Sequence, residues 1–118
     1  MTVTVNILGT EYKVTIKPYS EDEAFNHLIG YCDGYTKEIV VCDMQTHKDF
    51  ETEKAETCLA CQKATLRHEI VHAFLDESGL MSSACEVVGA WSKNEEMVDW
   101  IALQGEKIYK AWSEVGAL

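Results

Sequence analysis

Two histidines and a glutamate in the middle of the chain have the spacing of a metal site. His68, Glu69 and His72 form the pattern H-E-x-x-H. Residues four apart on an α-helix lie one turn above each other on the same face, so both imidazoles can bind one ion. Glu69 would lie about 100° further round the helix, where it can act as general base on a water molecule. Because histidine nitrogens are common ligands of Zn²⁺, we interpret His68 and His72 as two zinc ligands.

The residues around this pattern favour a metal over two isolated structural histidines. Leu66, Ile70, Ala73 and Phe74 are predicted to form an apolar stripe that buries the helix on the side away from the histidines. A buried helix that carries His, Glu and His needs partners for these polar groups, and a metal ion is such a partner. Two histidines leave zinc short of protein ligands, so a third ligand must come from elsewhere in the chain.

An acidic pair near the C-terminus can complete the site. Glu95 and Asp99 are also four residues apart, on a segment predicted to be the last helix. Glu95 would complete a His₂Glu ligand set with an open fourth position, and Asp99 could hydrogen-bond the far nitrogen of a ligand histidine. Glu96 is the alternative ligand. Acidic residues in a first turn also simply complement the helix dipole, which explains Glu95 and Glu96 but not Asp99.

Length and composition restrict the class of protein. The 118 residues suit a single domain, 1–118, with one modest core. The net charge of −10 disfavours nucleic acids and anionic membranes as partners. Neither an apolar run of about 18 residues nor a secretory signal is visible, which predicts a cytoplasmic protein. An odd number of cysteines fits reduced thiols there better than a disulfide framework; the five are Cys32, Cys42, Cys58, Cys61 and Cys85.

Alternation and turn signals predict strands in the first half of the chain. Residues 2–8 and about 11–17 are β-branched and alternating, with Gly9-Thr10 between them, which predicts a hairpin. Ser20 and Glu23 resemble a capping box and predict a short helix over about 21–28. Residues 37–42 form an apolar run that predicts a third strand, and residues 43–57 are interpreted as a loop in which His47 is solvated.

Two long helices are expected in the second half. The first starts near residues 53–56 and ends near Ser78, with Gly79 after it as the C-terminal cap. Residues 80–92 form a connection, and the last helix runs from Asn94 to about residue 112. Its predicted apolar face comprises Met97, Val98, Ile101, Ile108, Tyr109 and Trp112. The fold class is therefore α+β, with N-terminal strands in a small antiparallel or mixed sheet packed on the H-E-x-x-H helix and the C-terminal helix.

The two motifs together resemble a family of zinc peptidases. The H-E-x-x-H pattern followed by N-E-x-x-x-D at residues 94–99 is similar to the gluzincin signature. The arrangement over roughly residues 37–105 resembles small phage and bacterial metallopeptidases of the minigluzincin and ImmA/IrrE-like type. This resemblance implies a zincin-like fold, zinc ligands at His68, His72 and Glu95, and a catalytic base at Glu69. It also implies that the strand before the helix, at Ile39, Val40 and Val41, pairs with an extended substrate.

Three functions are compatible with these residues. The leading hypothesis is zinc-dependent hydrolysis of a peptide bond in a peptide or protein substrate, with Glu69 as general base. The alternative is a non-catalytic, zinc-stabilised module with a peptidase-like fold that binds a partner protein. A redox function of Cys58 and Cys61 has less support, because this C-x-x-C is isolated and no thioredoxin-like pattern flanks it.

Overall fold

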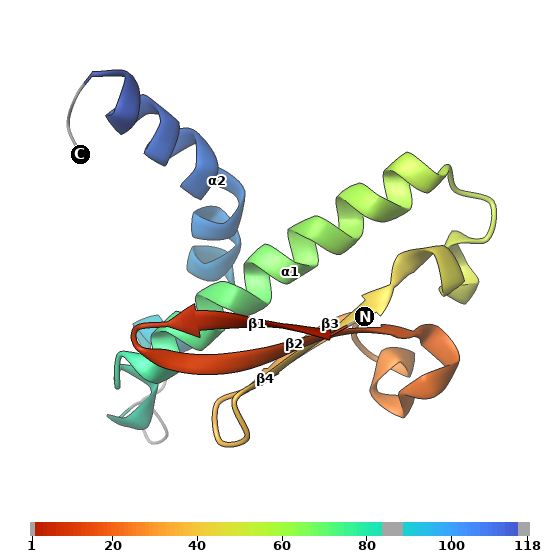
Figure 1. The fold of residues 1–118 in the computed structure, drawn as a ribbon, viewed down its shortest axis with the longest axis horizontal. Coiled ribbons are helices and arrows are strands. Elements are labelled where there is room, and N and C mark those ends of the chain that lie inside the picture. The colour runs from red at the N-terminus through yellow and green to blue at the C-terminus, as the bar shows by residue number, and fades with distance from the viewer. Residues whose placement is uncertain (1, 84–88, 116–118) are drawn as a thin grey trace.

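The N-terminal residues form the expected hairpin. The computed structural model describes residues 2–83 and 89–115 (Figure 1), with β1 at Thr2–Ile7 and β2 at Thr10–Pro18. The turn lies one residue earlier than predicted, at Leu8 and Gly9, whose φ angles are 52° and 92°. Two positive φ values in succession are typical of the tight turns whose twist matches paired strands.

The sheet has four strands in the order β1-β2-β4-β3. β4 (Glu38–Asp43) pairs in parallel with β2 on one side and antiparallel with β3 (Gly30–Asp33) on the other. The sequence predicted β4 but not β3, which has only four residues in a turn-rich stretch. The prediction that Ile39, Val40 and Val41 pair with an extended substrate is therefore wrong, because both edges of β4 are paired and β3 forms the edge of the sheet on this side.

The helix predicted over 21–28 is replaced by two 3₁₀ turns. These span Tyr19–Glu21 and Glu23–Asn26. The residue that caps the second turn is Asp22, whose side chain accepts a hydrogen bond from the Ala24 backbone N–H at 3.0 Å. The Asp22 carboxylate lies directly before the turn and caps it in place of Ser20, the predicted cap. The segment that follows is too short for a stable α-helix.

The loop after β4 is more ordered than the sequence suggested. It contains 3₁₀ turns at Met44–Thr46 and Lys48–Phe50. His47, predicted to be solvated, is buried: its ring contacts Tyr19 and Phe50, and its Nδ1 accepts from the Asp49 N–H at 3.1 Å. This histidine is part of the packing between the turns and does not approach the His68–His72 pair in any described contact.

The two long helices lie close to their predicted bounds. α1 spans Ala55–Glu77, and Gly79 follows it with a φ of 84°, as expected for a glycine that ends a helix. Two 3₁₀ turns, Met81–Ser83 and Trp91–Lys93, belong to the connection, of which residues 84–88 are not described. α2 spans Glu95–Glu114 and is capped by Asn94, whose side chain accepts from the Met97 N–H at 3.0 Å.

α1 lies across one face of the sheet (Figure 1) and contacts β1, β3 and β4. Ala73 is fully buried in this core, and Leu66 and Ile70 pack against it, as predicted. Phe74, the fourth residue of the expected stripe, is instead 42% exposed, because it lies at the margin of the stripe, furthest round the helix from its centre. The buried members of this core are Ile7, Tyr12, Val14, Ile39, Val41 and Ala73.

A second core cluster involves the cysteines. Cys42 and Cys58 are buried in it together with side chains of β4 and of the 3₁₀ turns, and Cys61 packs beside them. Cys32, Cys42, Cys58 and Cys61 are free thiols, whereas Cys85 lies outside the described residues. Cys58 and Cys61 thus act as small residues on the first turns of α1, which agrees with the structural interpretation of the C-x-x-C pattern.

α2 packs on α1 and not on the sheet. Only its first turns lie beside α1, and the rest extends away from the sheet (Figure 1). Val98 is fully buried and Ala102 is 8% exposed, but Tyr109 on the predicted apolar face is 62% exposed, because α2 has passed beyond α1 at that point. The Trp112 side chain lies outside the description. Among the helices described, none is long and apolar enough to cross a membrane.

Candidate metal centre

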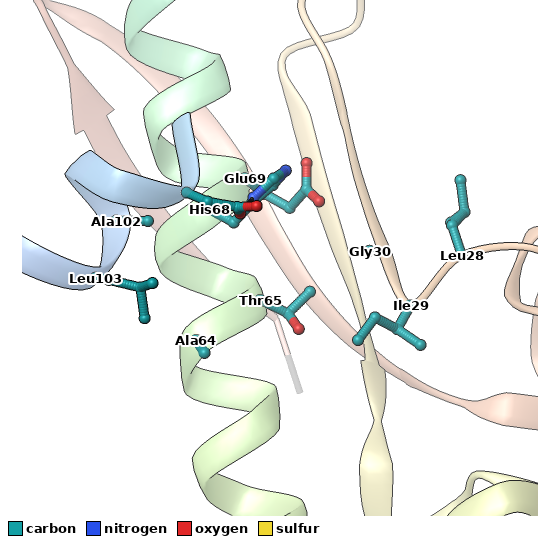
Figure 2. Close-up of a pocket in the computed structure, with 10 residues that line it drawn as sticks. Leu28, Ile29, Gly30, Ala64, Thr65, His68, Glu69, Ala102 and Leu103 are labelled. Atoms are coloured by element: carbon teal, nitrogen blue, oxygen red, sulfur yellow. Dashed lines mark hydrogen bonds and ion pairs between the residues drawn. The ribbon is translucent and has the colours of Figure 1, made fainter. Parts of the chain in front are cut away.

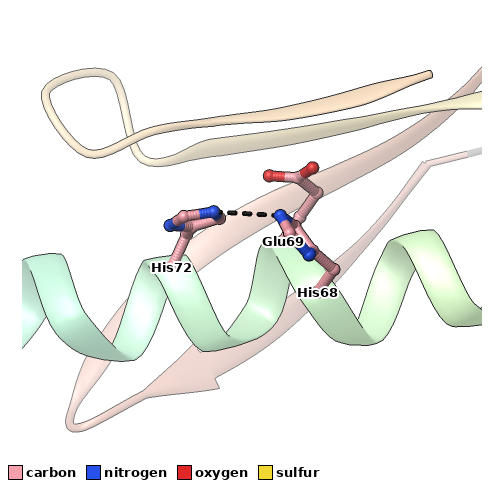
Figure 3. A group of neighbouring side chains, drawn as sticks. All are labelled: His68, Glu69 and His72. Atoms are coloured by element: carbon pink, nitrogen blue, oxygen red, sulfur yellow. Dashed lines mark hydrogen bonds between the residues drawn. The ribbon is translucent and has the colours of Figure 1, made fainter. Parts of the chain in front are cut away.

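His68 and His72 face each other on one side of α1 (Figure 3). Their Nε2 atoms are 3.0 Å apart, and the two rings meet edge to face with centroids 4.7 Å apart. The side chains of His68, Glu69 and His72 offer ligand atoms that all lie within 4.8 Å of one another. The helical spacing thus brings three potential donor groups together, and this cluster could hold a metal ion.

Glu95 reaches the same point from the other helix. Its Oε2 lies 3.1 Å from Nε2 of His68, and its Oε1 lies 3.3 Å from Nε2 of His72. The Asn94 cap begins α2 directly before Glu95, and Val98, about one turn further on, is fully buried. Glu96, the alternative candidate, is exposed and makes no described contact with the histidines.

Asp99 holds the opposite side of the His68 ring. Its Oδ1 is 2.6 Å from His68 Nδ1. An ionised carboxylate can only accept, so Nδ1 carries the proton and donates it, which leaves Nε2 with a free lone pair on the side facing His72 and Glu95. Within the described chain, no such partner is found for Nδ1 of His72. The structure therefore orients the two histidines by different means.

Glu69 lies beside the histidines but deeper in the fold. Figure 3 shows its carboxylate pointing away from the helix axis toward the β3–β4 hairpin. The residue is only 6% exposed. Burial raises the pKa of Glu69 to about 7; His68 lowers this pKa when its ring is protonated, and the charge of Glu95 raises it. A carboxyl group with this pKa can both take up and release a proton near neutral pH.

A groove separates the histidines from β3. Gly30, Tyr31 and Cys32 line one side of it, and His68, Glu69 and His72 line the other. Gly30 approaches α1 so closely that an added Cβ would lie 2.6 Å from Thr65 Cγ2 and 3.2 Å from Glu69 Oε1. The absence of a side chain at this position therefore allows the edge strand to pass directly beside Glu69.

On the side of β3 away from β4, the backbone groups have no hydrogen-bond partner among the residues that the structure describes. The Cys42 N–H donates to the Ile29 carbonyl at 2.9 Å, so odd-numbered residues of β3 form the ladder with β4. In an antiparallel pair, the alternate residues direct their N–H and C=O outward. The outward peptide groups are therefore those of Gly30 and Cys32, both of which line the groove.

The sequence-predicted residues differ in where they lie. His68, His72 and Glu95 are brought together, Asp99 contacts His68, and Glu69 lies beside them, whereas Ile39, Val40 and Val41 are inside the sheet. Sequence reasoning missed β3 and the close approach of Gly30 to Glu69. The signal available was weak: a glycine on each side of three residues that could form a strand, at 30–34.

Comparison with known proteins finds no matching family model, no matching curated protein and no matching solved structure.

Proposed function

We propose that this protein is a zinc-dependent peptidase in which Glu69 is the general base. The observation that carries the proposal is the convergence of three donor groups. The two Nε2 atoms are 3.0 Å apart, and each lies near one oxygen of the Glu95 carboxylate, His68 at 3.1 Å from Oε2 and His72 at 3.3 Å from Oε1. Ligands bound to one tetrahedral zinc at about 2.0–2.1 Å lie roughly 3.3 Å from each other, so these spacings are compatible with one shared ion.

The types of donor also favour zinc. Two neutral imidazoles and one carboxylate form a known catalytic zinc set, in which the fourth position is left for water or substrate. Magnesium and calcium prefer a shell of oxygen atoms, so two nitrogen donors argue against them. The hydrogen bond from His68 to Asp99 resembles the carboxylate–histidine pairs that raise ligand basicity at zinc sites.

The proposed reaction uses each residue in one role. When bound, zinc would supply a Lewis acid that polarises the scissile carbonyl and makes water a stronger acid. Glu69 removes a proton from the attacking water as its oxygen bonds to the carbonyl carbon. Glu69 then delivers this proton to the amide nitrogen as the carbon–nitrogen bond breaks, so the products are a carboxylic acid and an amine.

The outer edge of β3, which faces away from β4, offers a place for the peptide. Gly30 and Cys32 can each donate and accept one backbone hydrogen bond with an extended chain laid along the groove. Such pairing would hold the chain between β3 and the histidines, beside Glu69. We therefore transfer the substrate-aligning role, first expected at Ile39–Val41, to Gly30 and Cys32.

Two substitutions in α1 separate metal binding from chemistry. The variant Glu69→Gln should bind zinc as the unaltered protein does but lose about 10²- to 10⁴-fold in peptide hydrolysis, because the amide cannot accept a proton. The variant His68→Ala should lose zinc itself. Zinc content by mass spectrometry and cleavage of quenched fluorescent peptides measure the two effects. Unchanged hydrolysis in Glu69→Gln would overturn the mechanism.

One observation favours a second candidate, a metal-stabilised module that binds a peptide without cleaving it. Tyr31 lines the groove, but its hydroxyl donates to Asp22 Oδ2 at 2.7 Å, so it is not available to stabilise an oxyanion in this arrangement. A module of this kind would bind zinc and peptides but release no products. The same peptide assay on the zinc-loaded, unaltered protein decides between the two functions.

A further inference from the structure

A second cavity adjoins the metal centre on the side of His68. It has a volume of about 420 Å³ and lies between the segment before β3, the middle of α1, and α2. In Figure 2, Leu28 and Ile29 lie on one side, Ala102 and Leu103 on the other, and Ala64 and Thr65 between them. His68 and Glu69 lie at the same cavity, so a molecule held near Glu69 would extend directly into it.

The walls of this cavity are apolar away from the metal centre. Besides the residues of that centre, the one polar side chain among its lining residues is Thr65, whose hydroxyl already donates to the Cys61 carbonyl at 3.0 Å. Asp99 is engaged with His68 at 2.6 Å. A charged side chain entering the cavity would lose hydration without gaining a free partner in the far walls, which is costly. An apolar side chain would gain the free energy of burial.

We propose that this cavity is the specificity pocket of the site and accepts one large apolar side chain of a peptide substrate. The proposal rests on the proposed function, since it takes the bond to be cleaved to lie next to Glu69. The pocket volume falls within the range of about 300–1,000 Å³ of small-molecule sites, so a leucine- or phenylalanine-sized group fits inside. A peptide paired with Gly30 would have a side chain within reach of the pocket opening.

Two lining residues determine the size of the accepted side chain. Ala64 is one of the α1 residues in the wall, and its side chain is only a methyl group. Leu103 closes the side contributed by α2 and is itself 59% exposed, so it can be altered with little effect on the core. A large residue at position 64 should fill the pocket, whereas a small residue at position 103 should widen it.

Cleavage of matched peptides tests the proposal. The peptides differ at one position next to the cleaved bond, which carries Phe, Leu, Ala, Lys or Glu. Zinc-loaded protein should cleave the Phe and Leu peptides at least about 10-fold more efficiently than the Ala peptide, because burying a large apolar group is worth at least that factor. Lys and Glu peptides should be poorer still. Equal rates for all five, or a preference for Lys, would overturn the proposal.

The variant Ala64→Phe should abolish this preference and keep zinc binding. Its matched control is Ala60→Phe, which places the same group one turn earlier on α1 at an exposed position outside the pocket. The variant Leu103→Ala should shift the preference toward the larger Phe side chain. If Ala64→Phe and Ala60→Phe behave alike, the pocket does not select the substrate.

The pocket can be tested even if the protein does not cleave peptides. Absence of cleavage with zinc bound would contradict the proposed function but not the pocket. Binding of the same peptides, labelled with a fluorophore and followed by anisotropy, then decides the matter. Phe and Leu peptides should bind at least about 10-fold more tightly than the Ala peptide, and Ala64→Phe should remove this difference. Equal affinities of all the peptides would overturn the pocket itself.

Discussion

α1 is attached to its two neighbours in very different ways. Its C-terminal end is tied to the sheet by Glu77, whose carboxylate accepts from Thr10 Oγ1 at 2.6 Å, Tyr12 at 2.9 Å and Lys37 at 2.8 Å. The adjacent core is fully buried around Ala73. This side of α1 therefore has both apolar packing and a satisfied polar network.

The attachment of α1 to α2 is much lighter. It is based on Val98 and Ala102, with a hydrogen bond from Arg67 Nε to the Ala102 carbonyl at 3.2 Å and one from His68 Nδ1 to Asp99 at 2.6 Å. Glu95 and Asp99 reach the histidines, yet their side chains remain 62% and 60% exposed. The candidate site thus has one half on a firmly held helix and the other on a lightly held one. We infer that metal binding would itself fasten α2 to α1.

The largest effect should follow from removing Glu95, the proposed zinc ligand on α2. In Glu95→Ala, zinc affinity should fall by more than the about 10- to 100-fold typical of residues that only support a ligand. Glu96→Ala is the matched control and should change affinity little, because Glu96 makes no described contact with the site. Competition with a fluorescent chelator measures both variants. Equal losses in the two would contradict the assignment of Glu95.

A smaller loss should follow from weakening the support of His68. In the unaltered protein, the Asp99 carboxylate lies 2.6 Å from His68 Nδ1. In Asp99→Asn a neutral amide oxygen takes its place, and it accepts the hydrogen bond more weakly. Zinc affinity should fall by about 10- to 100-fold while both helices stay folded. Chelator competition gives the affinity, and circular dichroism checks the helices. An affinity equal to that of the unaltered protein would show that this hydrogen bond does not act on the metal site.

On the sheet side, adding one methyl group at Gly30 should destabilise the fold. In Gly30→Ala the new Cβ would lie 2.6 Å from Thr65 Cγ2, so the strand or helix must shift, at a cost of about 1–3 kcal/mol. The matched control is Gly105→Ala in α2, where nothing lies within 4 Å of the added Cβ. That change should stabilise by about 1 kcal/mol, because glycine is a poor helix former. Urea denaturation measures the free energy of unfolding of both variants. A change of the same sign in both would contradict the prediction.

The mildest prediction concerns the pH dependence of stability. Hydrogen bonds from Lys37, Thr10 and Tyr12 lower the pKa of Glu77 from 4.5 to about 2. Because the pKa of Glu77 is lower in the folded state, its ionised carboxylate stabilises the fold at pH values above about 4.5. This stabilisation is lost as the pH falls from about 4.5 toward 2. The effect should be modest, since the Lys37 side chain is 38% exposed.

The variant Glu77→Gln isolates this contribution. Its free energy of unfolding should depend less on pH over that acidic range, and it should already be lower than normal near neutral pH. Glu51→Gln, at an exposed position, is the control and should leave the pH profile unchanged. Parallel pH profiles for Glu77→Gln and the unaltered protein would show that the Glu77 network does not hold α1 to the sheet.

Local patterns predicted much of this molecule. The spacing of His68 and His72, the Asn94 cap and the glycine after α1 each act within one or two turns of helix, so the sequence displays them directly. The α+β class and the mixed sheet of the prediction agree with the structure at that level. Glu95 and Asp99 are four residues apart and so lie on one face of α2. Once α2 crosses α1, this spacing brings both of them to the histidines.

The remaining features depend on contacts between distant segments. β3 is short and poor in β-branched residues, so its strand character comes from pairing with β4 and not from its own composition. An apolar run such as Ile39–Val41 predicts a buried strand but not which neighbours it has. His47 is buried because three separate turns meet around it, and a sequence pattern does not display such a meeting.

The parallel pairing of β2 with β4 has a consequence for how the chain folds. The β1–β2 and β3–β4 hairpins close short loops, whereas Lys13 must find Glu38 across 25 residues. Closing such a loop costs entropy before its contacts return any stability, which slows this step. We expect the two hairpins to form early and the central pair to join them later. The wall of the groove that β3 provides would then form early. The opposite wall, which α1 provides, would be added only when α1 docks across the joined sheet.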